Sequence, residues 1–176
     1  QLTLSPLLLD TFLRLSVSIL ESPDFNEGNV GIWNEFFKEP AADANMEAEV
    51  RKRLGPFLLR AFRRPVDREV LERYTTYTLS KIKQGLPFTG SMKKVASAAL
   101  SSPMFLYRYG SANEKADLFT LASNLSFFFW ASSPDLELLR LAKSGELSKP
   151  EVLNKTINMM MADPKIERFL DSFPSQ

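Results

Sequence analysis

The sequence predicts an all-α protein, an irregular bundle of about seven to eight helices without a strand. Apolar residues recur at steps of three and four along most of the chain, which is the period of an amphipathic helix. Ser or Asp followed by Pro recurs where such patterns begin, and Pro suits the first helical position because its missing N–H has no intrahelical partner there. No segment shows the sustained two-residue alternation that is typical of a half-buried strand.

The first helix is expected over residues 6–20, and the turn-rich residues 22–31 end it. An aromatic segment at residues 32–37 is expected to close one end of the core. Small residues at 40–45 then form a linker, where we place the only soft boundary of the chain. The side chains expected on the buried face of the first helix are Leu8, Leu9, Phe12, Leu13, Val17 and Leu20.

Three helices are expected in the middle of the chain. An apolar stripe covers residues 46–63, and Gly55-Pro56 within it predicts a kink rather than two separate helices. Asp67 is placed to cap the next helix, and Gly85 lies just beyond the end of that helix. The third helix is expected at residues 88–100, where an alanine-rich face lets a neighbouring helix approach closely.

After a polar stretch at residues 110–116, the pattern predicts a helix over residues 117–130. Its last turn, residues 127–130, is apolar on all sides and is expected at the centre of the packing. Two short helices follow, with expected capping boxes that pair Ser132 with Asp135 and Ser148 with Glu151. The last helix is expected to start at Asp163-Pro164, with Ile166, Phe169, Leu170 and Phe173 facing inward.

These elements predict three segments in the chain. Residues 1–45 are interpreted as the tail of a preceding helical domain with a linker, and residues 46–109 as a helical domain. Residues 110–176 are interpreted as a further helical domain that continues past the last residue, and the last two segments are expected to share one core. A chain of this length buries about 70% of its unfolded surface, so that core needs no disulfide or metal.

Composition excludes several classes of function. With 22 Lys and Arg against 21 Asp and Glu, the net charge of +1 gives no general attraction for nucleic acid. The absence of His and Cys excludes a Cys or His zinc site, covalent haem attachment and a Ser-His-Asp or Cys-His pair within these residues. The longest wholly apolar run, residues 127–131, is far shorter than the roughly 20 residues of a membrane-spanning helix, and we expect a signal peptide to be absent or already removed.

Four arginines are the candidates for binding an anion. Arg60, Arg63 and Arg64 occur together in the run RAFRRP, and Arg108 lies between two tyrosines. A guanidinium group matches a carboxylate or a phosphate with two parallel hydrogen bonds, and a haem propionate is one such carboxylate. The alternative is structural, because cations are favoured at the carbonyl end of a helix and Arg108 could pair with an acid such as Asp117.

The remaining chemistry-bearing residues predict no active site. The aromatic cluster at residues 127–130 and the run Met159-Met160-Met161 are interpreted as core packing rather than a cofactor pocket. The sequence therefore predicts no catalytic residue, no metal ligand and no cofactor held by this chain. Acids that lie at helix starts, where they favour the helix dipole, are Asp67, Glu69, Glu72, Asp135 and Glu137.

Several motifs occur in one order along the chain. They are LTLSPLLL at residues 2–9, RAFRRPVD at 60–67, SSPMFLYR at 101–108, LASNLSFFFW at 121–130 with PDLELL at 134–139, and MMADP at 160–164. In this order they resemble the uncharacterised helical domains of unknown function that accompany planctomycete-type c-type cytochrome modules in large exported proteins.

The resemblance implies a context rather than an activity. It implies a segment of a multidomain, extracytoplasmic bacterial protein, in the periplasm or at the cell surface, in which a separate module binds haem c. The partners that it implies are the neighbouring domains of the same polypeptide, including the cytochrome module. It assigns no catalytic residue to this chain.

Two hypotheses for the function follow from the sequence. The first is a non-catalytic helical module that packs against neighbouring domains and positions them, for which we expect an exposed apolar patch around Phe169 and Phe173. The second is part of an oxidoreductase acting on an organic or carbohydrate substrate, in which the four arginines hold an acidic group of the substrate or of haem.

Overall fold

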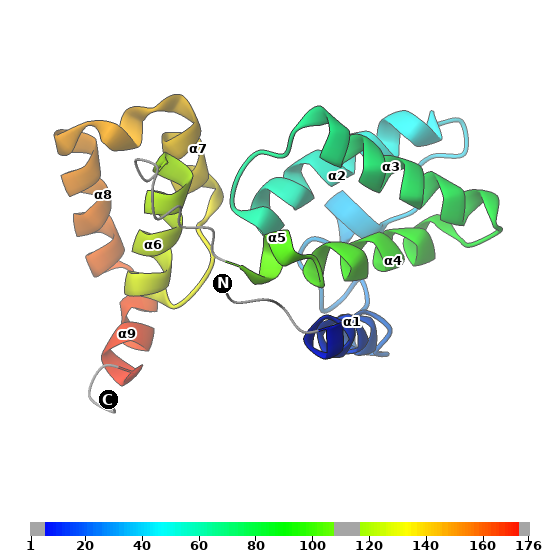
Figure 1. Cartoon of the computed structure of the whole chain (residues 1–176), viewed down its shortest axis with the longest axis horizontal. Helices are drawn as coiled ribbons and strands as arrows, with labels where there is room; N and C mark the ends of the chain where they lie inside the picture. Colours follow the sequence, from blue (N-terminus) through cyan, green and yellow to red (C-terminus); the bar gives the residue numbers. More distant parts are fainter. Residues whose placement is uncertain (1–5, 108–116, 173–176) are drawn as a thin grey trace. The chain divides into compact units, whose positions relative to one another are not determined.

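The computed structural model describes residues 6–107 and 117–172, and every regular element in these two ranges is helical (Figure 1). The all-α prediction is therefore confirmed for the described part of the chain. The chain divides into two compact units, which we call the first unit (residues 1–107) and the second unit (residues 108–176).

The first unit is built around α4. This helix packs against α1, α3 and the π-helical turn η1, while α2 packs against α3. Met92 and Val95 of α4 are fully buried, and the small side chains of Ala96 and Ala99 let neighbouring helices approach, as the alanine-rich face predicts. The elements of this unit are α1 (Pro6–Leu20), η1 (Trp33–Phe37), α2 (Met46–Phe62), α3 (Arg68–Lys83), α4 (Phe88–Leu100) and α5 (Pro103–Leu106).

The linker at residues 40–45 does not separate two bodies in this structure. Leu20, Phe36 and Phe37 are buried in the same apolar cluster as α2 and α4, so residues 1–45 belong to the first unit. In the second unit, Ala122, Trp130, Leu138 and Met160 belong to one buried apolar cluster, and a core shared by residues 46–176 stays a prediction. The division after Tyr107 lies close to the expected boundary after residue 109, and burial rather than local composition places residues 1–45 in the first unit.

Two helices of the first unit begin at a side-chain N-cap, and one of these caps was predicted. Asp67 Oδ1 accepts a hydrogen bond of 2.7 Å from the Val70 N–H and so caps α3 as predicted. Asn45 caps α2 in the same way, through the Ala48 N–H at 3.0 Å. Gly85 follows the end of α3 with φ of 90°, a left-handed conformation that glycine adopts without steric cost.

Pro56 lies inside α2, which runs as one helix over Met46–Phe62. The prediction of one helix instead of two is confirmed. Since proline removes one intrahelical donor, the helix depends on its packing, and Leu54 and Leu58 on either side of Pro56 are fully buried.

Hydrogen bonds at the start of α4 are made with residues that lie far away in the sequence. Its N-cap, Pro87, offers no side-chain acceptor, and Glu39 Oε1 instead accepts a hydrogen bond of 3.2 Å from the Thr89 N–H. The Thr89 hydroxyl donates a 2.6 Å hydrogen bond to the Phe37 carbonyl. These two bonds attach the segment after η1 to the first turn of the central helix.

The second unit packs α6 against α7, α8 and α9. Trp130, at the end of α6, is buried, and its indole N–H donates to the Met160 carbonyl of α8 at 3.2 Å. The Lys165 ammonium lies 4.3 Å from the centroid of the same ring system. The elements are α6 (Leu118–Trp130), α7 (Leu136–Ser144), η2 (Glu146–Ser148), α8 (Pro150–Ala162), η3 (Pro164–Ile166) and α9 (Glu167–Ser172).

Burial in the second unit corrects two expectations. The last turn of α6 is not buried on all sides, because Phe128 is 57% exposed while Trp130 is buried. Of the three consecutive methionines, only Met160 is buried, and Met159 and Met161 project from other faces of α8 into solvent. A single helix cannot direct three consecutive side chains into one core, since neighbours are about 100° apart.

Both predicted capping boxes were wrong in their details. Asp135, rather than Ser132, is the N-cap of α7, and it accepts from the Leu138 N–H at 2.8 Å. At α8 the N-cap is Lys149, and the Ser148 hydroxyl donates to the Gly145 carbonyl instead. Asp163 accepts from the Lys165 N–H and begins the short η3, so the last α-helix starts later than predicted.

We expect Thr89→Val to lower the free energy of unfolding of the first unit by about 1 to 2 kcal/mol, because the Phe37 carbonyl loses its donor while the side-chain shape is kept. Each unit carries one tryptophan, Trp33 and Trp130. Urea unfolding followed by Trp33 fluorescence in a Trp130→Phe background measures the first unit alone. Thr89→Ser keeps the hydroxyl and serves as the control; an equal loss in both variants would contradict the hydrogen-bond explanation.

Candidate functional site

Arg63 is the predicted anion-binding arginine that the structure describes most fully. It follows the last residue of α2 and adopts φ of 60°, one of two described non-glycine residues in the left-handed region, the other being Ala131. Its side chain is buried, with only 6% of the residue exposed. A left-handed conformation costs a non-glycine residue about 1 to 2 kcal/mol, so contacts of the side chain must offset that strain.

Those contacts are backbone carbonyls near the end of the first unit. Arg63 Nη2 donates to the carbonyls of Phe105 and Tyr107, each at 2.9 Å, and lies 3.5 Å from the Met104 carbonyl oxygen. Nη1 lies 3.4 Å from the Ala61 carbonyl oxygen. We call this group of contacts the Arg63 clamp; it joins the end of α2 to the end of α5.

The other predicted arginines differ from Arg63 in their surroundings. Arg60 is exposed on the last turn of α2. Arg64 is half-buried and has interactions of its own. Arg108 lies outside the described residues. For Arg63 the geometry matches the structural alternative, in which a guanidinium group satisfies carbonyl groups at a helix end.

Sequence reasoning missed Arg53, which has a similar role. Its guanidinium group donates to the Lys38 carbonyl, pairs with Glu49 at 3.2 Å and lies 4.8 Å from the centroid of the Phe88 ring. Arg53 therefore holds the chain after η1 against α2 and α4. Its spacing of four residues from Glu49 was the one signal in the sequence, and that spacing is common on exposed helix faces.

Several of the acids singled out in the sequence make structural contacts in the described part of the chain. Asp67 and Asp135 cap helices, and Glu72 receives a hydrogen bond of 2.7 Å from Arg51, which joins α2 to α3. That bond is the main reason why the pKa of Glu72 lies below its usual value. Among the described residues, no group of three or more acids is arranged to hold a metal ion.

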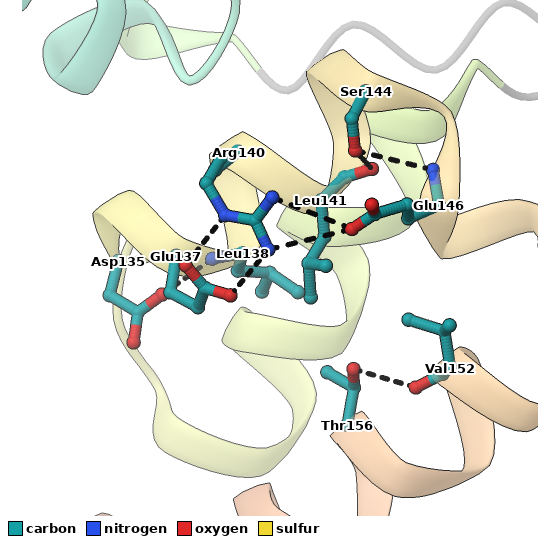
Figure 2. A network of polar contacts seen from close by, with 9 residues as sticks. All are labelled: Asp135, Glu137, Leu138, Arg140, Leu141, Ser144, Glu146, Val152 and Thr156. Carbon is teal, nitrogen blue, oxygen red and sulfur yellow. Dashed lines mark hydrogen bonds and ion pairs between the residues drawn. The ribbon is translucent and has the colours of Figure 1, made fainter.

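Figure 2 shows a polar network of the second unit, on α7 and the turn after it. Arg140 donates to both oxygens of Glu137, at 2.9 and 2.8 Å, and its two terminal nitrogens each lie 3.4 Å from Glu146 Oε2. The hydrogen bond from Arg140 is the largest cause that lowers the pKa of Glu137. All three side chains are about half exposed, so solvent screens these ion pairs. The lowered pKa keeps the Glu137 carboxylate ionised, and we interpret the network as a surface contact within the second unit.

Exposed apolar side chains of the first unit gather on α1. Leu15 and Ile19 are 53% and 54% exposed, and Leu8 and Leu13, which were expected on the buried face, are 44% and 41% exposed. Phe12 lies between them at helical spacing and is half-buried. We call Leu8, Phe12, Leu15 and Ile19 the α1 stripe.

The patch expected around Phe169 and Phe173 is described only in part. Phe173 lies outside the described residues. Phe169 is half-buried, with its ring centroid 5.0 Å from that of the exposed Phe128. The exposed apolar side chains of the described second unit are Phe128, Leu136, Met159 and Met161.

The described chain is all-helical and has two units, in which Arg53, Arg63 and several acids make structural contacts. Residues 49–109 match the family model described as PSD5: Protein of unknown function (DUF1595), and residues 117–176 match PSD4: Protein of unknown function (DUF1592). Each match covers about a third of the 176 residues. The chain therefore contains two domains of unknown function, and residues 1–48 lie outside both matches.

No curated protein and no solved structure matches this chain. No helix in the described ranges is long and apolar enough to cross a membrane.

Arg63→Ala is expected to lower the free energy of unfolding of the first unit by about 3 kcal/mol, since it leaves the Phe105 and Tyr107 carbonyls without their charged donor. Arg63→Gly is expected to be less destabilising than Arg63→Ala by about 1 kcal/mol, because glycine removes the left-handed strain. Urea unfolding measures both. Arg60→Ala, an exposed neighbour, is the control and should change stability by less than about 0.5 kcal/mol; equal effects of all three variants would contradict the clamp.

Acid is expected to weaken the second unit through Glu137. Because Arg140 lowers the pKa of Glu137 in the folded state, the ion pair stabilises the fold above the usual carboxyl pKa, and this contribution disappears as the pH falls through the lowered pKa. The melting temperature should therefore depend less on pH, between about pH 7 and pH 3, in Glu137→Gln than in the parent. Salt at about 0.5 M should reduce the difference between the two proteins, since the pair is exposed; identical pH profiles would contradict the role of Glu137.

Proposed function

We propose that this chain is a non-catalytic helical module that binds neighbouring domains of a larger extracytoplasmic protein and positions them. The observation that carries the proposal is the α1 stripe, an apolar surface on the flank of a helix whose adjacent face is packed on α4. Contiguous exposed apolar surface in a folded domain is typical of an interaction site.

The described polar residues support the same proposal. Arg63 and Arg53 donate to backbone carbonyls, and Asp67 and Asp135 cap helices. These groups are thereby committed to the fold. A reactive site needs a nucleophile, acid or base that is held ready for a substrate, and none of these four side chains is left in that state.

The identity of the neighbours rests on the resemblance of the motifs at residues 60–67, 101–108 and 121–130 to domains that accompany c-type cytochrome modules. On this basis the proposed partner is a cytochrome module of the same polypeptide, which would hold haem c itself. The proposed location is the periplasm or the cell surface. The matches to two domains of unknown function are compatible with this context and assign no activity.

The test is to mix the 176-residue chain with the cytochrome module of its own polypeptide and to measure the melting temperature and the haem absorption band. Binding to the folded state raises the melting temperature by mass action, so we expect a rise of several degrees at saturation. Leu15→Glu should abolish that rise, whereas Leu136→Glu, an equally exposed leucine in the second unit, should not.

The two readouts separate the possible results. A higher melting temperature with an unchanged haem band supports docking away from the haem, and a shifted band supports docking near the haem propionates, where the exposed Arg60 is the first residue to replace. No change in either quantity at high module concentration would overturn the proposed partner.

A further inference from the structure

We infer that residues 102–107, which we call the strap, detach from the first unit in a local opening step, and that Arg63 sets the equilibrium of this step. The strap contains α5 and the Tyr107 carbonyl that Arg63 binds. In Figure 1, α5 (green) lies beside α2 and α4. The inference does not depend on the proposed function, since it concerns how the two units of one chain are connected.

The helix of the strap has little stability by itself. It has 4 residues, Pro103–Leu106, and none of them is buried. A helix this short does not form alone in water, so α5 depends on its packing. The side chains that pack on the apolar cluster of the first unit are Met104 and Phe105, and both are only partly buried. Elements with few buried contacts are those that open before the rest of a domain unfolds.

Several hydrogen bonds of the strap are local. The Ser102 hydroxyl accepts from the Met104 N–H at 3.2 Å. The N–H groups of Leu106 and Tyr107 donate to carbonyls four residues earlier, at 3.0 and 2.9 Å. These bonds join residues within the strap, and they do not attach the strap to another helix.

Arg63 attaches the strap to the end of α2. Its Nη2 donates at 2.9 Å to the carbonyls of Phe105 and Tyr107, which lie 42 and 44 residues further along the chain. Its guanidinium carbon also lies 5.9 Å from the centroid of the Phe105 ring. Hydrogen bonds from a charged donor are stronger than neutral ones, so these contacts favour the closed strap.

The centre of the first unit is formed by other helices. Leu54 and Leu58 of α2 and Met92 and Val95 of α4 are fully buried. α4 packs on α1, α3 and η1, and α2 packs on α3. Opening of the strap leaves these helix pairs in contact, so it requires less free energy than unfolding of the whole unit.

Opening changes the length of chain between the two units. The second unit begins at residue 108, directly after the strap. An open strap therefore adds residues 102–107 to the connection, which is up to about 20 Å of extended chain. Arg63 thus controls whether the connection between the units is short or long.

Amide hydrogen exchange of the full chain, followed by NMR at urea concentrations below the unfolding transition, tests the separate opening. The exchange rates of the Leu106 and Tyr107 amides should be nearly independent of urea, because a local opening exposes little surface. The rates of the Val95 and Ala96 amides in α4 should rise steeply with urea. A parallel rise at all four amides would overturn the inference, because the strap would then open only when the unit unfolds.

Thr89→Val provides a second test that leaves Arg63 in place. This variant weakens the first unit at the first turn of α4, away from the strap. It should speed exchange of the Val95 and Ala96 amides by about 5-fold to 30-fold and leave the Leu106 and Tyr107 amides unchanged. Equal acceleration of both pairs would overturn the separate opening.

Arg63→Lys tests the role of the clamp. Lysine keeps the positive charge but lacks the planar fork of the guanidinium group, so exchange at Leu106 and Tyr107 should become about tenfold faster or more. Arg60→Ala, at an exposed position on the same helix, should leave both rates unchanged. Unchanged rates in Arg63→Lys, or an equal acceleration in Arg60→Ala, would overturn the assignment of Arg63.

Discussion

The first unit depends on a buried arginine in a strained backbone conformation. Arg63 reverses the chain at the end of α2 in the left-handed region, and this reversal directs its side chain under the end of α5. The carbonyls of Phe105 and Tyr107 come from the last residues of the unit, where the helix α5 offers them no intrahelical donor. One side chain thus fixes the turn between α2 and α3 and the point at which the chain leaves the unit.

The same physical solution recurs where η1 ends. Arg53 donates to the Lys38 carbonyl while its guanidinium group lies over the Phe88 ring, and Glu39 and Thr89 join the next residues to α4. Irregular backbone carries donors and acceptors that must be satisfied when the segment is buried. In a chain with only 7 glycines and no cysteine, long polar side chains fulfil this task at the helix junctions.

Local features of the structure were predictable from the sequence, because they depend on neighbouring residues. The span of α1, the cap at Asp67, the glycine after α3 and the continuity of α2 through Pro56 all follow from helix periodicity and terminal preferences. Long-range features were not predictable in this way. The bond from Thr89 to Phe37 spans 52 residues, and nothing in either segment indicates the other.

The role of Arg63 shows where sequence reasoning reaches its limit. The run RAFRRP is equally compatible with an anion site and with a helix end, since a guanidinium group bonds carboxylates, phosphates and carbonyls alike. For Arg63, burial against carbonyl groups favours the helix-end role, and that burial depends on where α5 packs. For the same reason, the exposed positions of Phe128 and Leu8 were not predicted, because periodicity identifies an apolar arc but not the part of the arc that neighbouring helices cover.

On α1 the apolar arc is wider than the part that α4 covers, and this difference supports the proposed interaction surface. A helix that only supports the first unit would need apolar residues on the face that meets α4 and polar residues elsewhere. α1 instead continues its apolar pattern onto a solvent-exposed flank, while it confines its two charged residues to one ion pair. It also lies outside the segments that match the two domains of unknown function. The exposed apolar side chains of α1 therefore belong to an element that the two matched segments do not include.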